Sequence, residues 1–397
     1  MAFFRNDAVN RVNLHSGVQA LGEGAGGIFF LVYMLEAGVS VAAALMAQAA
    51  ILAGRFVMRP VILPLARWLG LKPMVIIGTF GVALQYPLLA EVDGVGVELL
   101  LVCVVASIGE VFYWPSYNAY FAAIGDAEHR GHQVSARVAL VSVVSIAAPL
   151  LGTWALVTLG PRPMFAAVGL IQALAVVPLI GAPKVAVTAS APGAFRAARL
   201  GVILYAADGW LDAWFILVWQ IALFVSLGES ISAYGGAMAL AAIVGAGCGL
   251  ILGRHVDQGH GRRTVVIAYT VATAIVLMRA LSFDSAWLAV TSNALGALVL
   301  PLILPAQATA SYNLAKASPC PMRFIIACEG GWDVGCASAC LLAAALAAAG
   351  VSLSITILFA LPALAVLAHL LRRYFAEGAV ARIPTPAGVG TSAHDGA

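Results

Sequence analysis

Charged residues are scarce in this sequence. They make up 10% of the 397 positions, whereas 62% of the positions are hydrophobic and the mean hydropathy is +0.99. A soluble domain carries roughly 25% charged residues, so the composition excludes an ordinary water-soluble protein. The apolar runs are also long. Residues 26–54 contain one acid and no base, which exceeds the ~20 residues that cross a bilayer as a helix. The chain is therefore predicted to be an integral membrane protein.

Polar, glycine and proline residues divide the chain into about twelve apolar segments. We expect these helices to begin near residues 14, 40, 74, 98, 133 and 163, and again near 200, 232, 264, 286, 322 and 352. The predicted fold is an all-α integral membrane protein with two pseudo-symmetric six-helix bundles, residues 1–183 and 200–374. Residues 184–199 have the composition of a cytoplasmic linker. Residues 375–397, rich in Gly, Pro and Ala, are expected to be a disordered cytoplasmic tail.

The basic residues fall almost entirely on one side of this arrangement. Of the 21 Lys and Arg residues, only Arg162 and Arg279 are assigned to the other side. The positive-inside rule makes the basic side cytoplasmic. We therefore expect a multi-pass protein of the cell inner (cytoplasmic) membrane with both termini in the cytoplasm. The net charge of +3 reflects this topology and does not indicate nucleic-acid binding. We expect a monomer in the lipid bilayer without a cofactor.

Cysteine is also sparse, with six residues that show no disulfide pattern. Cys328, Cys336 and Cys340 share one face of the predicted eleventh span, beside Glu329 and Asp333. Thiolates and carboxylates together could bind a soft metal ion. Cysteine is equally a small apolar residue of helices. We favour the second interpretation and predict no metal site.

The two halves of the chain align when one is shifted by 190 residues. Three pairs of residues then coincide or lie one position apart: Pro115 with Pro305, Arg67 with Asp257, and Glu23 with Asp212. Duplicated halves are typical of carriers that alternate access to a central site. Chance similarity between Ala-, Leu- and Val-rich segments is the alternative explanation.

The loop after the second span of the second half carries a recognisable pattern. Gly253 and Asp257 are followed by Gly261, Arg262 and Arg263. This pattern resembles a signature of the major facilitator superfamily, although one extra residue separates Asp257 from Gly261. An acid at a helix end beside arginines can form charge-assisted hydrogen bonds that act as a cytoplasmic gate.

The corresponding loop of the first half, LPLARWLGLKP, has Arg67 in place of the acid. We expect its gate to use a different partner, Asp126 or Glu128.

The fifth span contains AAPLLGT, from Ala147 to Thr153. It resembles a packing motif of the superfamily's antiporters, with Pro149 and Gly152 in place, while Ala148 and Thr153 replace two of its glycines. Small residues let helices approach closely, and a proline lets a helix bend. The resemblance therefore implies close packing of this span and points toward antiport.

Ionisable residues within membrane spans cost at least ~2.5 kcal/mol each, so each one is a candidate functional residue. The spans contain six acids: Glu23, Glu110, Asp208, Asp212, Glu329 and Asp333. Polar and aromatic side chains accompany them: Tyr113, Trp114, Tyr117, Asn118 and Trp210. The superfamily lines its cavity with the first, fourth, seventh and tenth spans, which implies that the first four acids face the solute. A structural role near a helix end is the alternative for each acid, and it is strongest for Glu329.

We expect acids to outnumber bases in this interior, with Arg55 and Arg279 close to a membrane face. Buried acids without a cation favour their protonated form, and such groups can carry protons. The predicted function is proton-coupled efflux, by antiport, of a small cationic or neutral amphipathic solute. The alternatives are uptake of a small nutrient or metal complex, and a receptor or assembly factor that has lost transport. No nucleophile or nucleotide-binding loop points to an enzyme.

Overall fold

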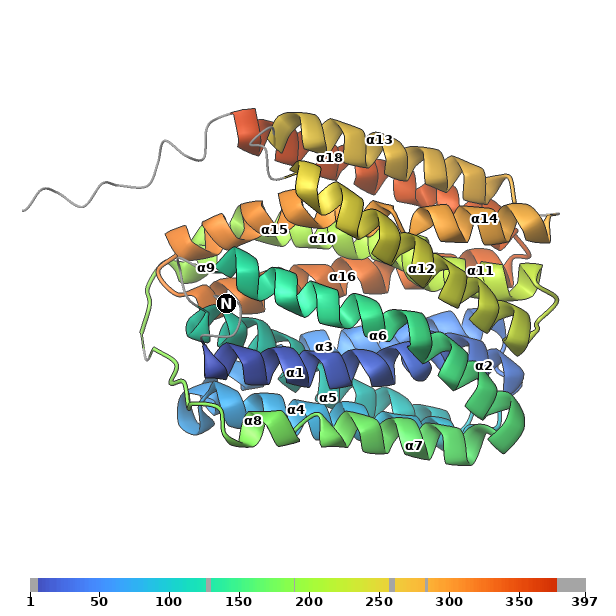
Figure 1. The fold of residues 1–397 in the computed structure, drawn as a ribbon, viewed down its shortest axis with the longest axis horizontal. Helices are drawn as coiled ribbons and strands as arrows, with labels where there is room; N and C mark the ends of the chain where they lie inside the picture. Colours follow the sequence, from blue (N-terminus) through green and yellow to red (C-terminus); the bar gives the residue numbers. More distant parts are fainter. Residues whose placement is uncertain (1–5, 126–129, 189, 257–260, 283–284, 377–397) are drawn as a thin grey trace, which may run out of the picture.

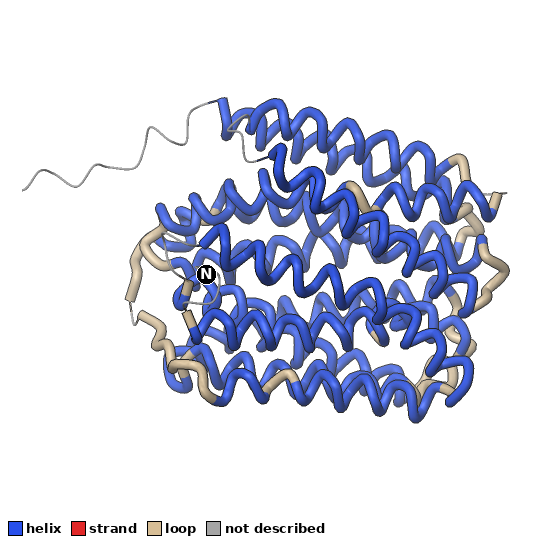
Figure 2. The backbone as a smooth tube through the Cα atoms, in the orientation of Figure 1, coloured by secondary structure: helices blue, strands red, loops and turns tan. Residues whose placement is uncertain are grey.

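The computed structural model describes residues 6–125, 130–188, 190–256, 261–282 and 285–376 (Figures 1 and 2). Throughout these ranges the regular elements are helices joined by short connections. The all-helical fold that the composition predicts is thus confirmed.

The first half contains the first six predicted spans. Their elements are α1 (Asp7–Ala25), η2 (Gly27–Phe29), α2 (Phe30–Glu36), α3 (Val41–Leu69), α4 (Leu71–Leu89), α5 (Val97–Ile124), α6 (Arg130–Leu159), α7 (Pro161–Leu174) and α8 (Val177–Ile180). A short helix, α9 (Ala194–Ala197), lies in the connection to the second half.

The second half contains the other six predicted spans. Its elements are α10 (Arg199–Asp212), η3 (Ala213–Val218), α11 (Trp219–Ser226), α12 (Ile231–Val256), α13 (Gly261–Ala280), α14 (Ala286–Gly296), α15 (Val299–Ala317), α16 (Pro321–Ala348), α17 (Leu353–Thr356), η4 (Ile357–Phe359) and α18 (Ala360–Ala376).

These helices match the predicted membrane spans. In the described part of the chain, 10 helical segments are long and apolar enough to cross a membrane. Two shorter apolar helices, Val143–Leu159 and Ile231–Gly247, lie within α6 and α12, where the fifth and eighth spans are expected. The protein is therefore a multi-pass membrane protein.

The helices run side by side in two groups (Figure 1). Those of residues 7–180 form the lower group in that view, and those of residues 199–376 form the upper group. The start of α1, the connection containing α9 and the end of α18 all lie at one end of the bundle, which we call the linker end. Between the groups, α16 packs along both α3 and α10, and α6 packs along both α1 and α12.

Glycines explain how α16 fits between two neighbours. A Cβ atom on Gly330 would lie 3.4 Å from Cδ of Arg59 on α3. A Cβ atom on Gly331 would lie only 2.6 Å from the carbonyl oxygen of Val202 on α10. The sequence EGGWDVG thus places small residues on two faces of one helix, and both neighbouring backbones can approach it closely.

The first span of each half is irregular directly after its acid. After Glu23, α1 ends at Ala25 and one turn of 3₁₀ helix follows. After Asp212, α10 changes to the π-helix η3. Such irregular turns leave backbone groups outside the regular α-helical pattern and are frequent at functional sites. Both spans can therefore bend where their acids lie.

Candidate functional site

Two arginines and three carboxylates form a buried ion-pair cluster. Nη1 of Arg55 lies 2.7 Å from Oε2 of Glu110, and Nη2 of Arg55 lies 3.0 Å from Oδ1 of Asp333. Arg59 pairs through Nη2 with the other carboxylate oxygen of Asp333. Oε2 of Glu329 lies 3.7 Å from Nη2 of Arg55. Asp333 thus bridges both guanidinium groups, and we call these five residues the central cluster.

The central cluster joins the two halves of the protein near mid-membrane. Arg55, Glu110 and Asp333 each lie near the middle of a helix of 28 or 29 residues. Such a helix is about 42 Å long, so its middle falls inside a hydrocarbon core about 30 Å thick. Since α3 and α5 belong to the first half and α16 to the second, these ion pairs cross the interface.

This placement corrects two expectations from the sequence. Arg55 does not lie close to a membrane face, and Arg59 does not belong with the basic residues outside the membrane; both are buried. The interior is accordingly not poor in bases. Pro60, directly after Arg59, makes the segment look like a helix end, yet α3 continues to Leu69. The acids that neutralise the arginines come from distant parts of the chain, so local patterning does not reveal them.

Three further contacts extend the central cluster. The Arg55 guanidinium carbon lies 5.3 Å from the ring centroid of Trp332, a distance at which cation–π attraction operates. Nε1 of Trp332 donates a hydrogen bond of 3.1 Å to Oδ2 of Asp212 on α10. Nδ2 of Asn118 donates a hydrogen bond of 3.1 Å to Oε1 of Glu329. Asp212 is therefore connected to the cluster through one tryptophan.

A cavity of about 210 Å³ lies beside the central cluster. Its lining combines acids, glutamines and aromatic rings: Glu23 and Glu110; Gln19, Gln48, Gln85 and Gln220; Phe30, Tyr86, Tyr113 and Trp114. Leu217 and Gln220 come from the seventh span, whereas the other lining residues come from spans of the first half. The cavity therefore lies between the halves, and Glu110 belongs to both the cavity and the cluster.

Glu23 differs from the other lining acid. Glu110 is neutralised by Arg55, but within the described residues Glu23 takes part in no ion pair. Its carboxyl group can therefore bind or release a proton, or contact a cation, without breaking an existing pair. Among the cavity's acids, Glu23 is the one free to change its charge in this conformation.

Comparisons with known proteins support the fold. No protein-family model matches the chain, and no curated protein sequence matches it. Solved structures do match. The crystal structure of the human organic anion transporter MFSD10 (TETRAN) has a TM-score of 0.67 at 14% identity, covering 92% of this chain and 99% of its own.

Two other crystal structures also match this chain. The major facilitator transporter FucP, in the outward conformation, has a TM-score of 0.66 at 14% identity, covering 94% of this chain and 99% of its own. A mutant of the nucleoside transporter NupG has a TM-score of 0.64 at 13% identity, covering 93% of this chain and 100% of its own. This chain has the major facilitator fold. All three matched proteins are transporters rather than enzymes.

Within the major facilitator fold, the structure separates the aromatic residues that the sequence grouped together. Tyr113 and Trp114 line the cavity, with their ring centroids 5.1 Å apart. Nε1 of Trp210 instead donates a hydrogen bond of 2.8 Å to the carbonyl oxygen of Phe359. Trp210 therefore connects the seventh and twelfth spans and does not face the cavity. Asp208 and Asp212 are also absent from the cavity lining.

His15 is a buried polar residue that the sequence analysis missed. The break between α7 and α8 leaves the carbonyl oxygen of Ala175 available, and Nδ1 of His15 lies 2.7 Å from it. Because a carbonyl oxygen only accepts, Nδ1 carries the proton. Nε2 of the neutral ring then accepts from the Tyr113 hydroxyl at 3.0 Å. His15 thus orients a tyrosine of the cavity wall.

Tyr117 lies one turn further along α5. Its hydroxyl lies 2.5 Å from Oγ of Ser16 and accepts a hydrogen bond of 3.1 Å from Nη1 of Arg137. Tyr113 and Tyr117 stack with centroids 5.5 Å apart. Tyr117 therefore supports Tyr113 and does not itself line the cavity. The polar pair His15–Ser16 in an apolar run is the signal that could have revealed this group.

The packing motif of the fifth span lies between two other helices. A Cβ atom on Gly152 would lie 2.8 Å from the carbonyl carbon of Ala25 on α1. On α12, a Cβ atom on Gly235 would lie 2.9 Å from Cβ of Thr153. Pro149 is buried within α6. The motif thus packs α6 closely against one helix of each half.

The acids of the predicted cytoplasmic gate lie outside the described residues: Asp257 and the proposed partners of Arg67, Asp126 and Glu128. Gly253 lies in α12, and Gly261, Arg262 and Arg263 begin α13. Arg67 and Arg263 are exposed. The gate remains a prediction.

The eleventh-span cysteines pack in the protein interior. Cys328, Cys336 and Cys340 are all buried, and Sγ of Cys328 would lie 2.6 Å from a Cβ atom on Gly201 of α10. In the part of the chain that the structure describes, no group of three or more metal-ligating side chains occurs.

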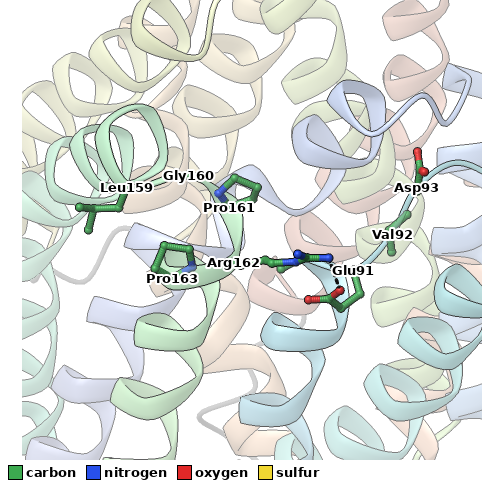
Figure 3. A pocket seen from close by; sticks show the side chains of 9 residues that line it. Glu91, Val92, Asp93, Leu159, Gly160, Pro161, Arg162 and Pro163 are labelled. Carbon is green, nitrogen blue, oxygen red and sulfur yellow. Dashed lines mark hydrogen bonds and ion pairs between the residues drawn. The ribbon is translucent and has the colours of Figure 1, made fainter.

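A second hollow, of about 480 Å³, lies at the α4–α5 and α6–α7 connections (Figure 3). It is formed by residues 90–93 and 159–163. Nη2 of Arg162 lies 2.9 Å from Oε2 of Glu91, and both side chains are exposed. This surface pair contrasts with the buried central cluster and supplies a control for it.

Proposed function

We propose that this chain is a secondary transporter that moves a small cationic or neutral organic solute across a membrane by alternating access, in exchange for protons. The observation that carries the proposal is the unpaired carboxyl group of Glu23 in a cavity shared by both halves. In this cycle, Glu23 binds either a proton or the solute. The solute leaves when a proton takes its place.

The charges around the cavity support a solute without negative charge. Among the described lining residues there is no lysine or arginine. The nearest bases, Arg55 and Arg59, are already paired with Glu110, Glu329 and Asp333. MFSD10 is named an organic anion transporter. An anion in this cavity would instead meet carboxylates without a free cation.

The central cluster supports alternating access because it links α3 and α5 to α16. When the halves rock against each other, these contacts must shift together. A buried ion pair that loses one partner is strongly destabilised, so conformations that keep every charge paired are favoured. The cluster thereby restricts the halves to a few arrangements.

The direction of transport is proposed from the fifth span. Its AAPLLGT sequence packs α6 closely between α1 and α12. Close contact of α6 with these two helices would seal the pathway, which favours an exchanger. We propose export across an inner membrane, by a monomer with both termini in the cytoplasm. Uptake would use the same site, and the sign of flux under an imposed proton gradient distinguishes the two.

Replacement of Glu23 by glutamine should abolish proton exchange. Glutamine keeps the size and polarity of the side chain but cannot bind or release a proton near neutral pH. In vesicles containing a trapped pH-sensitive dye, organic cations, sugars and nucleosides would be added one at a time. We expect a solute that changes internal pH with the wild-type protein to have no effect with Glu23→Gln.

The matched control is Glu91→Gln, which makes the same chemical change at the exposed pair with Arg162. It should exchange protons at the wild-type rate. If Glu23→Gln retains that rate as well, the proton is carried by another group and the role proposed for Glu23 is wrong.

A further inference from the structure

The cavity contains amide groups that have no partner. Gln19, Gln48, Gln85 and Gln220 line it, together with the unpaired acid Glu23. Both side-chain atoms of Gln19, Nε2 and Oε1, are buried and make no hydrogen bond with any described residue. The same holds for Oε1 of Gln85. The side chains of Gln19 and Gln85 are 3% and 5% exposed, so bulk water does not cover these atoms.

These atoms restrict the chemistry of a bound molecule. A buried polar atom without a hydrogen bond is costly, because the protein interior does not replace the water that it lost. An amphipathic molecule with a mainly apolar surface would leave the amide of Gln19 and Oε1 of Gln85 unpaired. An amide offers both donors and an acceptor, and a hydroxyl group is also both donor and acceptor. Several hydroxyl groups on one molecule would therefore match several amides in either orientation.

The lining is also rich in aromatic rings. Phe30, Tyr86, Tyr113 and Trp114 contribute rings, and the Tyr113 and Trp114 rings meet edge to face. His15 holds the Tyr113 hydroxyl, so that ring has a defined position. A flat aromatic surface suits the C–H face of a saturated ring, while amides suit the hydroxyl groups around its rim. The cavity combines these two surfaces.

The charge distribution favours a neutral molecule. Glu110 is neutralised by Arg55, so Glu23 is the one lining acid without a paired base in the described chain. A neutral solute can donate a hydroxyl hydrogen bond to the ionised Glu23, in place of the proton, and takes its other hydrogen bonds from the amides. Four glutamines provide far more hydrogen-bonding capacity than one small organic cation can use.

We propose that the solute is a neutral polyhydroxylated molecule of monosaccharide or polyol type, bound by the amides of Gln19 and Gln85 and packed against the aromatic rings of the cavity. This assignment rests on the proposed transport function and narrows its solute class. It replaces an amphipathic solute with a hydrophilic one.

The first test is binding at equilibrium, which does not require transport. The purified full-length protein would be heated with individual pentoses, hexoses and hexitols, with deoxy analogues of each, and with the amphipathic cation tetraphenylphosphonium. We expect at least one sugar or polyol to raise the melting temperature in a concentration-dependent way. Its deoxy analogue should bind about tenfold more weakly if the missing hydroxyl contacts an amide. Stabilisation by tetraphenylphosphonium alone, or by none of these compounds, would overturn the assignment.

Variants then locate the site. Gln19→Met and Gln85→Met keep the side-chain length but remove the amide, and each should raise the Kd of the stabilising sugar about tenfold. The matched control is Gln307→Met. Gln307 lies on α15 and does not line the cavity. Its variant should bind the sugar as the wild type does. Equal binding by all three variants would place the site elsewhere.

The same experiments separate this inference from the transport proposal. Glu23→Gln should still bind the sugar, because a glutamine carbonyl oxygen accepts the same hydrogen bond from a hydroxyl, while losing proton exchange. Sugar binding without any solute-driven proton movement in wild-type vesicles would contradict the transport proposal and leave the solute class intact. Proton exchange driven only by organic cations would support the transport proposal and contradict a sugar or polyol as the solute.

Discussion

Replacing Asp333 with asparagine is expected to lower the free energy of unfolding by about 3–5 kcal/mol, the effect of removing one partner from a buried ion pair. Asp333 is fully buried and bridges Arg55 and Arg59. Without the Asp333 charge, Arg59 would have no ion-pair partner among the described residues, and Arg55 would retain Glu110 and the more distant Glu329. The change would be measured as the shift in unfolding midpoint of the protein in detergent micelles.

Two further variants make this prediction specific. Asp333→Asn combined with Arg59→Gln removes one charge of each sign and should recover part of the lost stability, because fewer charges are left unpaired. Glu91→Gln breaks the exposed pair with Arg162 and should change stability by no more than about 1 kcal/mol. If Asp333→Asn is as mild as Glu91→Gln, the central cluster does not hold the halves together.

Replacing Gly152 with valine is expected to cost about 1–3 kcal/mol, the usual effect of overfilling a packed interior, and to stop transport. The first added carbon would lie 2.8 Å from the carbonyl carbon of Ala25, which belongs to a rigid backbone and cannot rotate away. Because α6 contacts both α1 and α12, pushing it outward disturbs both halves. Thermal unfolding would report the stability, and the vesicle assay would report the transport.

Gly236→Val is the matched control for Gly152. Gly236 lies in the membrane helix α12, and a Cβ atom there would meet no neighbouring atom within 4 Å. Valine at this position should leave stability and transport close to wild type. Equal losses in both variants would indicate a general effect of valine in these helices and not the contact with Ala25.

The central cluster shows why the sequence predicted its acids and misjudged its bases. Glu110, Glu329 and Asp333 stand out because acids are rare in long apolar segments. Arg55 and Arg59 could be read as the basic end of a helix, since Pro60 follows them. Whether an arginine is buried depends on a carboxylate from another helix. For Arg59 that carboxylate belongs to Asp333, which is 274 residues further along the chain.

For the cavity, the sequence predicted the acid and the aromatic residues but missed the amides. Glu23, Tyr113 and Trp114 were expected to face a solute, and they line the cavity together. Its glutamines do not stand out in the sequence, because a single glutamine in an apolar helix is common and carries no charge. Gln19, Gln48, Gln85 and Gln220 acquire meaning only as a group, and they come from four different spans.

The sequence by itself determined the membrane location, the all-helical fold and the number and order of the spans. These properties depend on composition and on segment length, since a bilayer requires about 20 consecutive apolar residues with every backbone group hydrogen-bonded within the span. Tertiary structure alone decided which polar side chains meet. Which helix faces pack together decides the pairing of Arg55 and Arg59 with distant acids and the unpaired state of Glu23. It also decides which amide atoms of Gln19 and Gln85 have no partner. Glycines and helix breaks permit that packing, but their local pattern does not name the partner.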